Sequence, residues 1–212
     1  MFTYGPFEMK DDAERIEFIE QRTFANVIAS SETGPQAAHV PMIVQRDDAG
    51  NVYLEGHVAR SNPMAKLAAG GVPSLAIFNG VDAYVTPSYY PSKQVHGKVA
   101  PTWNYIAVHA TGVLDTFDDA GELRGHLEAL TGKLEGGREV PWTVADAPED
   151  FTEKMVAAIM GLRLRVTALE GVRKLNQNQR DADLVGARDG LLASGDVMSK
   201  LVAEEMAKES GR

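Results

Sequence analysis

The feature that most constrains the fold is a run of β-rich segments that follow one another as hairpins. Short segments with strand character are separated by turn signals, and two longer β-rich segments come later in the chain. The segments are 24–30, 38–45, 51–58, 74–79, 83–86, 103–117 and 162–169, with turns predicted at 46–51 and 80–82. Strands joined in this way, without regular strand–helix alternation, argue against a doubly wound parallel sheet.

Helical patterns lie between and after these strands. Asp11 and Asp12 are suited to cap a first helix, and Asn62-Pro63 to open a second one that Gly70-Gly71 ends. Further helices are predicted at 119–132, 148–160, 181–194 and 196–208. The chain is therefore predicted to be one domain, 1–212, mainly β with peripheral helices (α+β), with a helical C-terminal segment at about 181–208. A six- or seven-stranded antiparallel barrel fits best, because closure removes exposed strand edges.

Composition excludes several classes of site. The 212 residues include no cysteine, which excludes disulfides, thiolate metal sites and cysteine nucleophiles. No apolar run is long enough to cross a membrane, and the N-terminus lacks the pattern of a signal peptide. We therefore expect a cytoplasmic protein without membrane association. The histidines show no metal-ligand spacing, and no catalytic acid/base constellation or phosphate-binding glycine loop is identified.

The net charge of −9 argues against indiscriminate DNA binding, which depends on Lys and Arg at phosphates. The best candidates for a local basic patch are Arg163 and Arg165 on a predicted strand, with Arg173 and Lys174 just after it. A solvated strand face explains the same residues. No helix-turn-helix pattern is present, so direct DNA binding is doubtful.

One proline-rich segment concentrates aromatic and polar residues. Residues 84–93 and 99–105 contain four of the six tyrosines, one of the two tryptophans, and Lys93 among serines and threonines. Rings, hydroxyls and a cation on a stiff loop suit a flat anionic ligand with polar edges, and such loops often carry function. The alternative is an ordinary proline-rich connection between strands.

Several motifs together resemble a known family. They are Phe2-Thr-Tyr-Gly-Pro-Phe7, Ala38-His-Val-Pro41, Gly56-His-Val-Ala-Arg-Ser-Asn-Pro63, Ser88-Tyr-Tyr-Pro-Ser-Lys93, Pro101-Thr-Trp-Asn-Tyr105 and Lys174-Leu-Asn-Gln-Asn178. The chain resembles the PaiB family of FMN-binding negative transcriptional regulators. That family belongs to the split-barrel flavin-binding proteins related to pyridoxamine-phosphate oxidase. The resemblance implies an antiparallel split barrel, FMN as cofactor, and a homodimer with two flavin sites at its interface. Haem is a minor alternative, because a related split-barrel branch handles it.

The resemblance assigns Arg60, Ser61 and Asn62 to the flavin phosphate and ring edge. A guanidinium and a hydroxyl are suited to a phosphate, and the helix start that follows favours an anion. Simple helix capping with a solvated arginine is the alternative. His39 and His57, expected on neighbouring strands of one hairpin, either face the flavin or are half-buried barrel histidines.

The aromatic segment supplies the other predicted contacts. Ser88 and Lys93 are candidates for the phosphate or for closing over the ring, and Tyr89 and Trp103 for a flat wall beside it. The same rings also suit a dimer interface. The predicted cofactor-binding residues are completed by Thr102, Lys174 and Gln177.

The chain departs from the family pattern in one loop. Where the family often has Lys-Leu-Ser-Gln-Asn-Arg, this sequence has Lys174-Leu-Asn-Gln-Asn-Gln-Arg180, so Asn176 replaces the serine and Gln179 displaces the arginine. The predicted function is an FMN-binding regulator that acts through DNA or a protein partner. An FMN-dependent oxidoreductase is the alternative, and a cofactor-free dimeric scaffold is a third.

Overall fold

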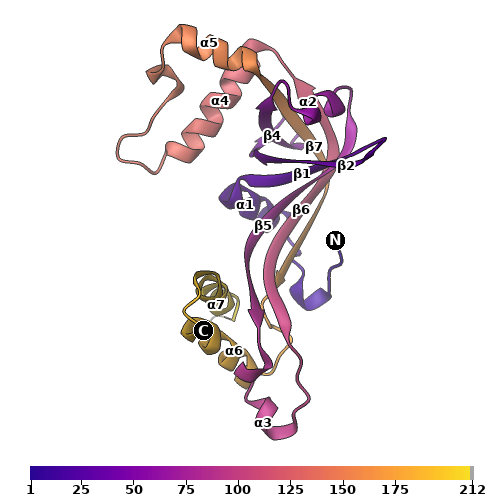
Figure 1. Ribbon diagram of the computed structural model, residues 1–212, viewed down its shortest axis with the longest axis vertical. Coiled ribbons are helices and arrows are strands. Elements are labelled where there is room, and N and C mark those ends of the chain that lie inside the picture. The colour runs from indigo at the N-terminus through magenta and orange to yellow at the C-terminus, as the bar shows by residue number, and fades with distance from the viewer. Residues whose placement is uncertain (211–212) are drawn as a thin grey trace. The chain divides into compact units, whose positions relative to one another are not determined.

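The computed structural model describes residues 1–210 and is built on a seven-stranded antiparallel sheet (Figure 1). The strands of this described part are β1 (Phe24–Ser31), β2 (Gly34–Pro41), β3 (Ile43–Arg46), β4 (Val52–Ala59), β5 (Val72–Val85), β6 (Thr102–Phe117) and β7 (Ile159–Lys174). Their order in the sheet is β2-β1-β5-β6-β7-β4-β3. The helices are α1 (Asp12–Arg22), α2 (Pro63–Ala68), α3 (Ser92–His96), α4 (Ala120–Glu135), α5 (Glu149–Ala158), α6 (Asp181–Ala193) and α7 (Val197–Ser210). The predicted α+β class, rich in antiparallel strands, is confirmed.

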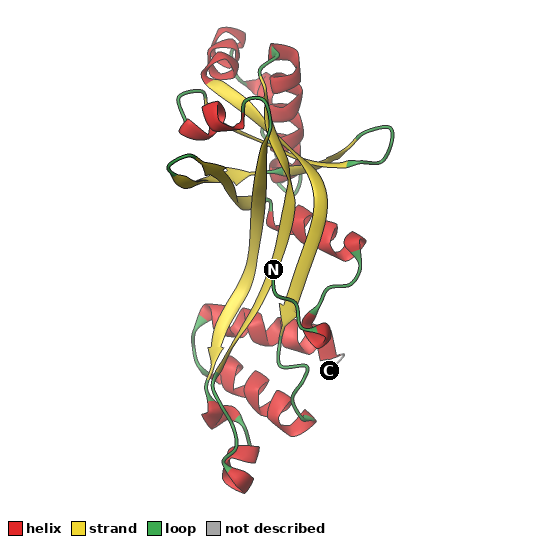
Figure 2. Cartoon of the chain, turned by 90° about the vertical axis from the view of Figure 1, so that its right-hand side faces the viewer, coloured by secondary structure: helices red, strands yellow, loops and turns green. Residues whose placement is uncertain are grey.

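The chain divides into two compact units. The first unit comprises residues 1–15, 79–108 and 170–212, and the second comprises 16–78 and 109–169. The long strands β5, β6 and β7 each contribute residues to both units, and they are the longest strands in yellow in Figure 2.

The second unit contains the short strands. β1 and β2 form a hairpin in which Phe24 is opposite Pro41 and Ser31 is opposite Gly34, and β3 pairs with β4 across the predicted turn at 46–51. Buried residues alternate with more exposed ones along β1 and the second half of β2, as expected for strands with one buried face. The fully buried side chains of this unit include Val27, Val40, Met42, Leu54, Phe78, Leu114, Leu162 and Leu164.

The predicted strand at 38–45 is two strands in the structure. Pro41 ends β2, because proline has no N–H to continue the ladder with β1. Met42 follows with its N–H donated to the carbonyl of Thr23 at 2.7 Å, and β3 then pairs with β4 instead. The chain therefore changes strand partner at this proline.

The predicted turn at 80–82 is wrong. β5 runs without interruption from Val72 to Val85. Gly80 is not among the glycines with positive φ, and alternate burial resumes beyond it at Val81, Ala83 and Val85, shifted by one position from Ser74, Ala76 and Phe78. The apolar alternation thus outweighs the turn propensity of the Asn-Gly pair. β7 is also longer than predicted, so Arg173 and Lys174 lie in the strand and not after it.

The first unit places two C-terminal helices next to the aromatic segment. α6 and α7 are formed where helices were predicted, at 181–193 and 197–210. α6 carries Gly186 and Gly190 on one face. A Cβ at Gly190 would lie 2.3 Å from the Tyr89 ring, and one at Gly186 would lie 2.3 Å from the Tyr89 carbonyl oxygen. The two glycines therefore let the aromatic segment approach the helix backbone closely.

Candidate ligand-binding site

The aromatic segment of the first unit is folded into short helical turns. Thr86 caps a 3-10 turn at Pro87–Tyr89 by accepting a hydrogen bond from the Ser88 N–H, and α3 follows at Ser92–His96. Tyr90 is buried, and its hydroxyl accepts a hydrogen bond from the Asn176 amide at 3.1 Å. Rigid turns of this kind hold the side chains of the segment in place.

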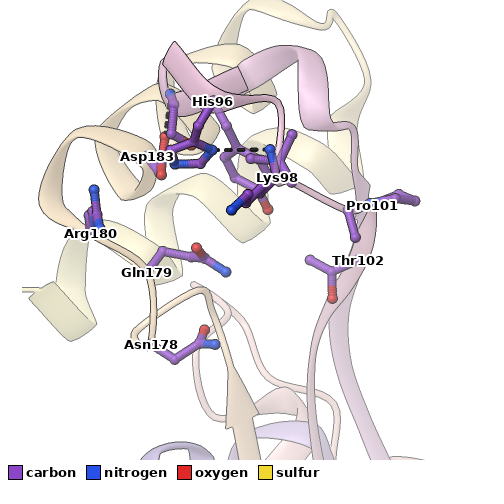
Figure 3. A pocket seen from close by; sticks show the side chains of 12 residues that line it. His96, Lys98, Pro101, Thr102, Asn178, Gln179, Arg180 and Asp183 are labelled. Atoms are coloured by element: carbon purple, nitrogen blue, oxygen red, sulfur yellow. Dashed lines mark hydrogen bonds between the residues drawn. The ribbon is translucent and has the colours of Figure 1, made fainter. Parts of the chain in front are cut away.

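A cavity of about 730 Å³ opens between this segment and the loop before α6 (Figure 3). We call it the loop cavity, and it lies wholly in the first unit. It is lined by Tyr90, Ser92, His96, Lys98, Val99, Ala100, Pro101, Thr102, Asn178, Gln179, Arg180 and Asp183. Small-molecule sites occupy about 300–1,000 Å³, so its size suits a metabolite. In Figure 3 Asn178 and Gln179 extend toward the strand that carries Thr102.

Positive groups predominate around the loop cavity. Lys98 and Arg180 line it, and no ion pair to either is present in the described part of the chain. Lys174 donates to the Thr102 hydroxyl at 2.7 Å, which adds a third cation beside the cavity. The one carboxylate in the lining, Asp183, is buried and accepts the Ser92 N–H at 3.0 Å. The arrangement favours an anion.

Tyr90 is one of the residues that line the cavity. Burial raises the pKa of its hydroxyl, the hydrogen bond from Asn176 partly opposes that rise, and the charge of Asp183 adds to it. The group is therefore a neutral phenol at physiological pH. Asn176 has φ of 67°, a left-handed conformation that asparagine tolerates better than serine. This is a physical reason for asparagine at a position where the family pattern has serine.

Arg60, Ser61 and Asn62, which were predicted to bind the flavin phosphate, lie in the second unit at the end of β4. The Arg60 guanidinium donates to the Ala157 carbonyl at 3.1 Å and lies 3.5 Å from Asp118 in an exposed ion pair. Asn62 caps α2 by accepting the Met64 N–H at 2.9 Å, and Ser61 is exposed. The helix that follows has only six residues. Asn62 therefore acts as a helix cap. Arg60 and Ser61 remain the exposed hydrogen-bond donors of this segment.

His57, on β4, contacts a residue that the sequence did not single out. Its Nδ1 lies 3.1 Å from Nε2 of His126 on α4, and the two rings meet edge to face. Burial lowers the pKa of His57. The pKa of His126 falls to about 4, chiefly through burial, with further lowering by the charges of His57 and Arg163.

His39 is not the hairpin neighbour of His57, contrary to the prediction. It lies on β2, which pairs with β1, and its Nδ1 is 2.5 Å from the Asn26 side-chain oxygen. β4 pairs instead with β3 and β7. The change of strand partner after Pro41 separates the two histidines in the sheet order.

The remaining predicted residues lie in the first unit. Lys93 donates to the Ser88 hydroxyl at 3.0 Å, and Trp103 donates to Asp82 at 2.9 Å. Tyr89 packs against α6, so its ring also has a structural role. Gln177 holds its own loop, accepting the Leu175 N–H and donating to the Arg173 carbonyl. The structure therefore brings Thr102 and Lys174 together, and Ser88 and Lys93.

Sequence reasoning missed part of the cavity lining and the histidine partner. His96, Lys98 and Asp183 had no motif of their own, although the altered loop at 174–180 was a signal for Asn178, Gln179 and Arg180. His126 carried no local signal. Among the described residues no cluster of His, Asp or Glu is able to hold a metal ion, and no helix is long and apolar enough to cross a membrane.

Comparison with known proteins identifies the family. Residues 1–168 match the family described as "Putative FMN-binding domain". The chain is 27% identical to the protease synthase and sporulation protein PAI 2 of Bacillus subtilis, over 94% of this chain and 93% of that protein. A protein of Aspergillus fumigatus is 30% identical over 83% of each chain.

Solved structures show the same fold at low sequence identity. The FAD and haem binding protein of Mycobacterium smegmatis superposes with a TM-score of 0.58 at 17% identity, covering 84% of this chain and 78% of that one. The flavocytochrome Anf3 of Azotobacter vinelandii gives a TM-score of 0.58 at 12% identity, covering 82% and 72%. The predicted antiparallel split-barrel fold of the flavin-binding type is thus confirmed. The chain belongs to the FMN-binding domain family, as its resemblance to the PaiB proteins predicted.

Proposed function

We propose that this protein binds FMN and acts as a PaiB-like negative regulator. The observation that carries the proposal is the family match over residues 1–168, which includes the Gly56–Pro63 motif and the aromatic segment. The relative PAI 2 is named as a protease synthase and sporulation protein, and its similarity extends over nearly the whole chain. That name supports a regulatory role over a purely structural one.

The donor groups present fit an FMN phosphate at the end of β4. Arg60 and Ser61 combine a guanidinium with a hydroxyl, the chemistry that a near-dianionic phosphate requires. The only ion pair of Arg60 among the described residues is the one to Asp118 at 3.5 Å, in which both side chains are substantially exposed. Exposed pairs of this kind contribute little, so the guanidinium can exchange that partner for a ligand.

FMN supplies hydride or one-electron transfer at its ring, and the protein supplies binding and orientation. In this chain Arg60 and Ser61 would hold the phosphate. His57, whose ring is kept neutral by burial, would present an uncharged hydrogen-bonding group. We propose no protein residue as a catalytic acid or base.

We propose a homodimer as the functional assembly. Tyr84 and Trp103 lie on the surface of the first unit with ring centroids 6.0 Å apart, and each is 50% exposed. Paired exposed aromatic rings are unusual on a monomeric surface and typical of an interface. A second copy of the chain, or the flavin ring, would cover them.

Regulation would operate through a metabolite or a protein partner rather than by direct DNA recognition. Arg163 is paired with Glu55 and Glu122, each at 2.6 Å, and Arg173 is paired with Glu14 and Glu205. Two of the four cations of the candidate basic patch are therefore neutralised within the fold. Few charges remain to release counterions from DNA.

The experiment that tests FMN binding is a titration of the apo protein with FMN, FAD, riboflavin and haem, followed by flavin fluorescence and visible absorption. We expect saturable binding of FMN, weaker binding of riboflavin, and no Soret shift with haem. Absence of saturable flavin binding would contradict the proposal and favour a cofactor-free scaffold.

A second candidate function is an FMN-dependent oxidoreductase. The observation in its favour is the fold shared with the flavocytochrome Anf3, at a TM-score of 0.58. Bleaching of the bound flavin by NADH or NADPH, faster than that of free FMN, would favour this candidate over the regulator.

A further inference from the structure

The loop cavity extends beyond the part of the chain that the FMN-binding match covers, although the Tyr90–Thr102 side of its lining lies inside that match. That match ends at residue 168, whereas one wall of the cavity is formed by Asn178, Gln179, Arg180 and Asp183. The cavity also lies wholly in the first unit, whereas Arg60 and Ser61 belong to the second. It is therefore a candidate for a second ligand.

The lining offers several hydrogen-bond donors, two of them charged. Lys98 and Arg180 are exposed cations with no carboxylate partner in the described part of the structure. Thr102 already accepts from Lys174, so its own O–H is available for donation. His96 accepts the Lys98 N–H at Nδ1, which leaves Nε2 as the N–H of the neutral ring. In a chain with a net charge of −9, such a cluster marks a place for an anion.

Two acceptors in the lining each already accept one hydrogen bond within the fold. Asp183 accepts the Ser92 N–H, and the Tyr90 hydroxyl accepts from Asn176. The residues Val99, Ala100 and Pro101 add a short apolar strip to the lining. A ligand that fits this pattern has a strongly anionic group and a small, partly apolar body.

The loop that departs from the family pattern holds its donors in fixed positions. Asn176 adopts the left-handed conformation, and Gln179 donates its N–H to the Asn176 carbonyl at 2.9 Å, which closes a tight turn. Arg180 then occupies the N-cap position of α6 in extended conformation. The additional residue Gln179 therefore brings an amide into the lining while Arg180 stays at the cavity.

We propose that the loop cavity binds a small phosphomonoester, with Lys98 and Arg180 as its charge-bearing contacts and Thr102 as a hydroxyl donor. This assigns Thr102 and Lys174 to the second ligand instead of to FMN. A planar guanidinium and an ammonium group in one cavity are together suited to the two negative charges of such a phosphate. A ligand bound in the loop cavity would contact both sides of its lining, residues 90–102 and 178–183. Through this contact a metabolite could influence the regulator.

Calorimetric titration of glycerol 3-phosphate and inorganic phosphate into the full-length protein, with and without saturating FMN, tests the proposal. We expect saturable binding of glycerol 3-phosphate with an equal affinity in both states. Lys98→Gln and Arg180→Gln should each weaken it by about tenfold, the scale of one charge-assisted contact. Lys200→Gln, which removes an exposed cation on α7 outside the lining, should leave it unchanged.

Three results would overturn the inference. One is the absence of saturable heat up to about 10 mM ligand, an affinity too weak for a built site. Another is equal weakening by Lys200→Gln, which would mean that only the overall charge matters. The third is competition between FMN and glycerol 3-phosphate, which would place the flavin phosphate in this cavity. The titration of glycerol 3-phosphate without FMN does not require flavin binding. Its result therefore tests the loop cavity even if the proposed FMN binding is wrong.

Discussion

The imidazole rings of His57 and His126 share one hydrogen bond, with Nδ1 of the first 3.1 Å from Nε2 of the second. His126 is only 3% exposed, and its Nδ1 is one of the buried side-chain atoms of the described residues without a partner. Arg163, whose guanidinium lies over the Phe117 ring, adds positive charge nearby, although Glu55 and Glu122 pair with it. Burial and the nearby positive charge therefore favour the neutral form of His126, and the hydrogen bond would be lost if both rings were protonated, because neither nitrogen could then accept.

This relationship predicts loss of stability in acid. The pKa of His126 is lowered from 6.5 to about 4, so the native state resists protonation and the unfolded state does not. The contribution of neutral His126 to the free energy of unfolding is complete above about pH 6.5. It is lost as the pH falls from there to about 4, which lowers the free energy of unfolding by up to about 3 kcal/mol. Urea unfolding between pH 4 and 8 measures it.

His126→Leu should flatten the pH dependence of the free energy of unfolding between about pH 4 and 6.5. His96→Gln, a change at an exposed histidine, should not flatten it. An unchanged slope in His126→Leu would show that other groups cause the acid sensitivity.

The contact between Tyr89 and α6 predicts a sharp steric effect. Gly190→Ala places a methyl group 2.3 Å from the Tyr89 ring, so either the ring or the helix must shift. We expect destabilisation of about 1–3 kcal/mol, the usual cost of overpacking. Thermal and urea unfolding measure the loss, and Tyr89→Ala in the same chain should partly restore stability.

Gly125→Ala is the matched control. Gly125 lies inside α4, and a Cβ there meets nothing within 4 Å. Because alanine is the better helix former, this variant should gain about 0.5–1 kcal/mol. Equal effects of the two substitutions would refute the packing argument.

Arg60→Ala tests the proposed phosphate contact. FMN binding should weaken by about 1.5–3 kcal/mol, the scale of a hydrogen bond to a charged group. Riboflavin, which lacks the phosphate, should lose little affinity. Arg124→Ala, which removes the arginine paired with Glu149 beside the same surface, should change neither. Equal losses for FMN and riboflavin would mean that Arg60 acts through structure.

The exposed aromatic pair predicts self-association. Light scattering at micromolar concentration should show a dimer, and Trp103→Lys should shift it toward monomer by placing a charge in the interface. Trp142→Lys is the control, because Trp142 is exposed to a similar extent, 49% against 50%, in the other unit. A monomeric wild-type protein would contradict the proposal directly.

The ion pairs of Arg163 and Arg173 predict weak DNA binding. At about 150 mM salt we expect no sequence-specific complex in a gel-shift or anisotropy assay, because specific binding usually builds on several free cations at phosphates. Glu55→Gln, which leaves Arg163 with one acidic partner, should not create such a complex. A nanomolar, sequence-specific complex of the wild-type protein would instead support a direct regulator.

Local features of the fold were predictable because they depend on neighbouring residues. The β1 alternation, the caps of α2 and α4, and the C-terminal helices follow from periodicity and from Asn62 and Asp119. The continuity of β5 through Gly80 was not predictable from the Asn79-Gly80 dipeptide, which favours a turn. The burial of Val81 and Val85 in the folded sheet decided it. At Pro41 the missing N–H is a local signal for a break, but the change of strand partner from β1 to β4 depends on the tertiary structure.

The sequence by itself determined the class of fold, the family and the residue types suited to an anionic flavin. Only the tertiary structure decided which of those residues meet. Lys174 reaches Thr102 across 72 positions, and His57 finds His126 across 69. The loop cavity likewise joins residues 90–102 to residues 178–183. Such contacts depend on the path of the whole chain, because residues far apart in sequence carry no local pattern that specifies their partner.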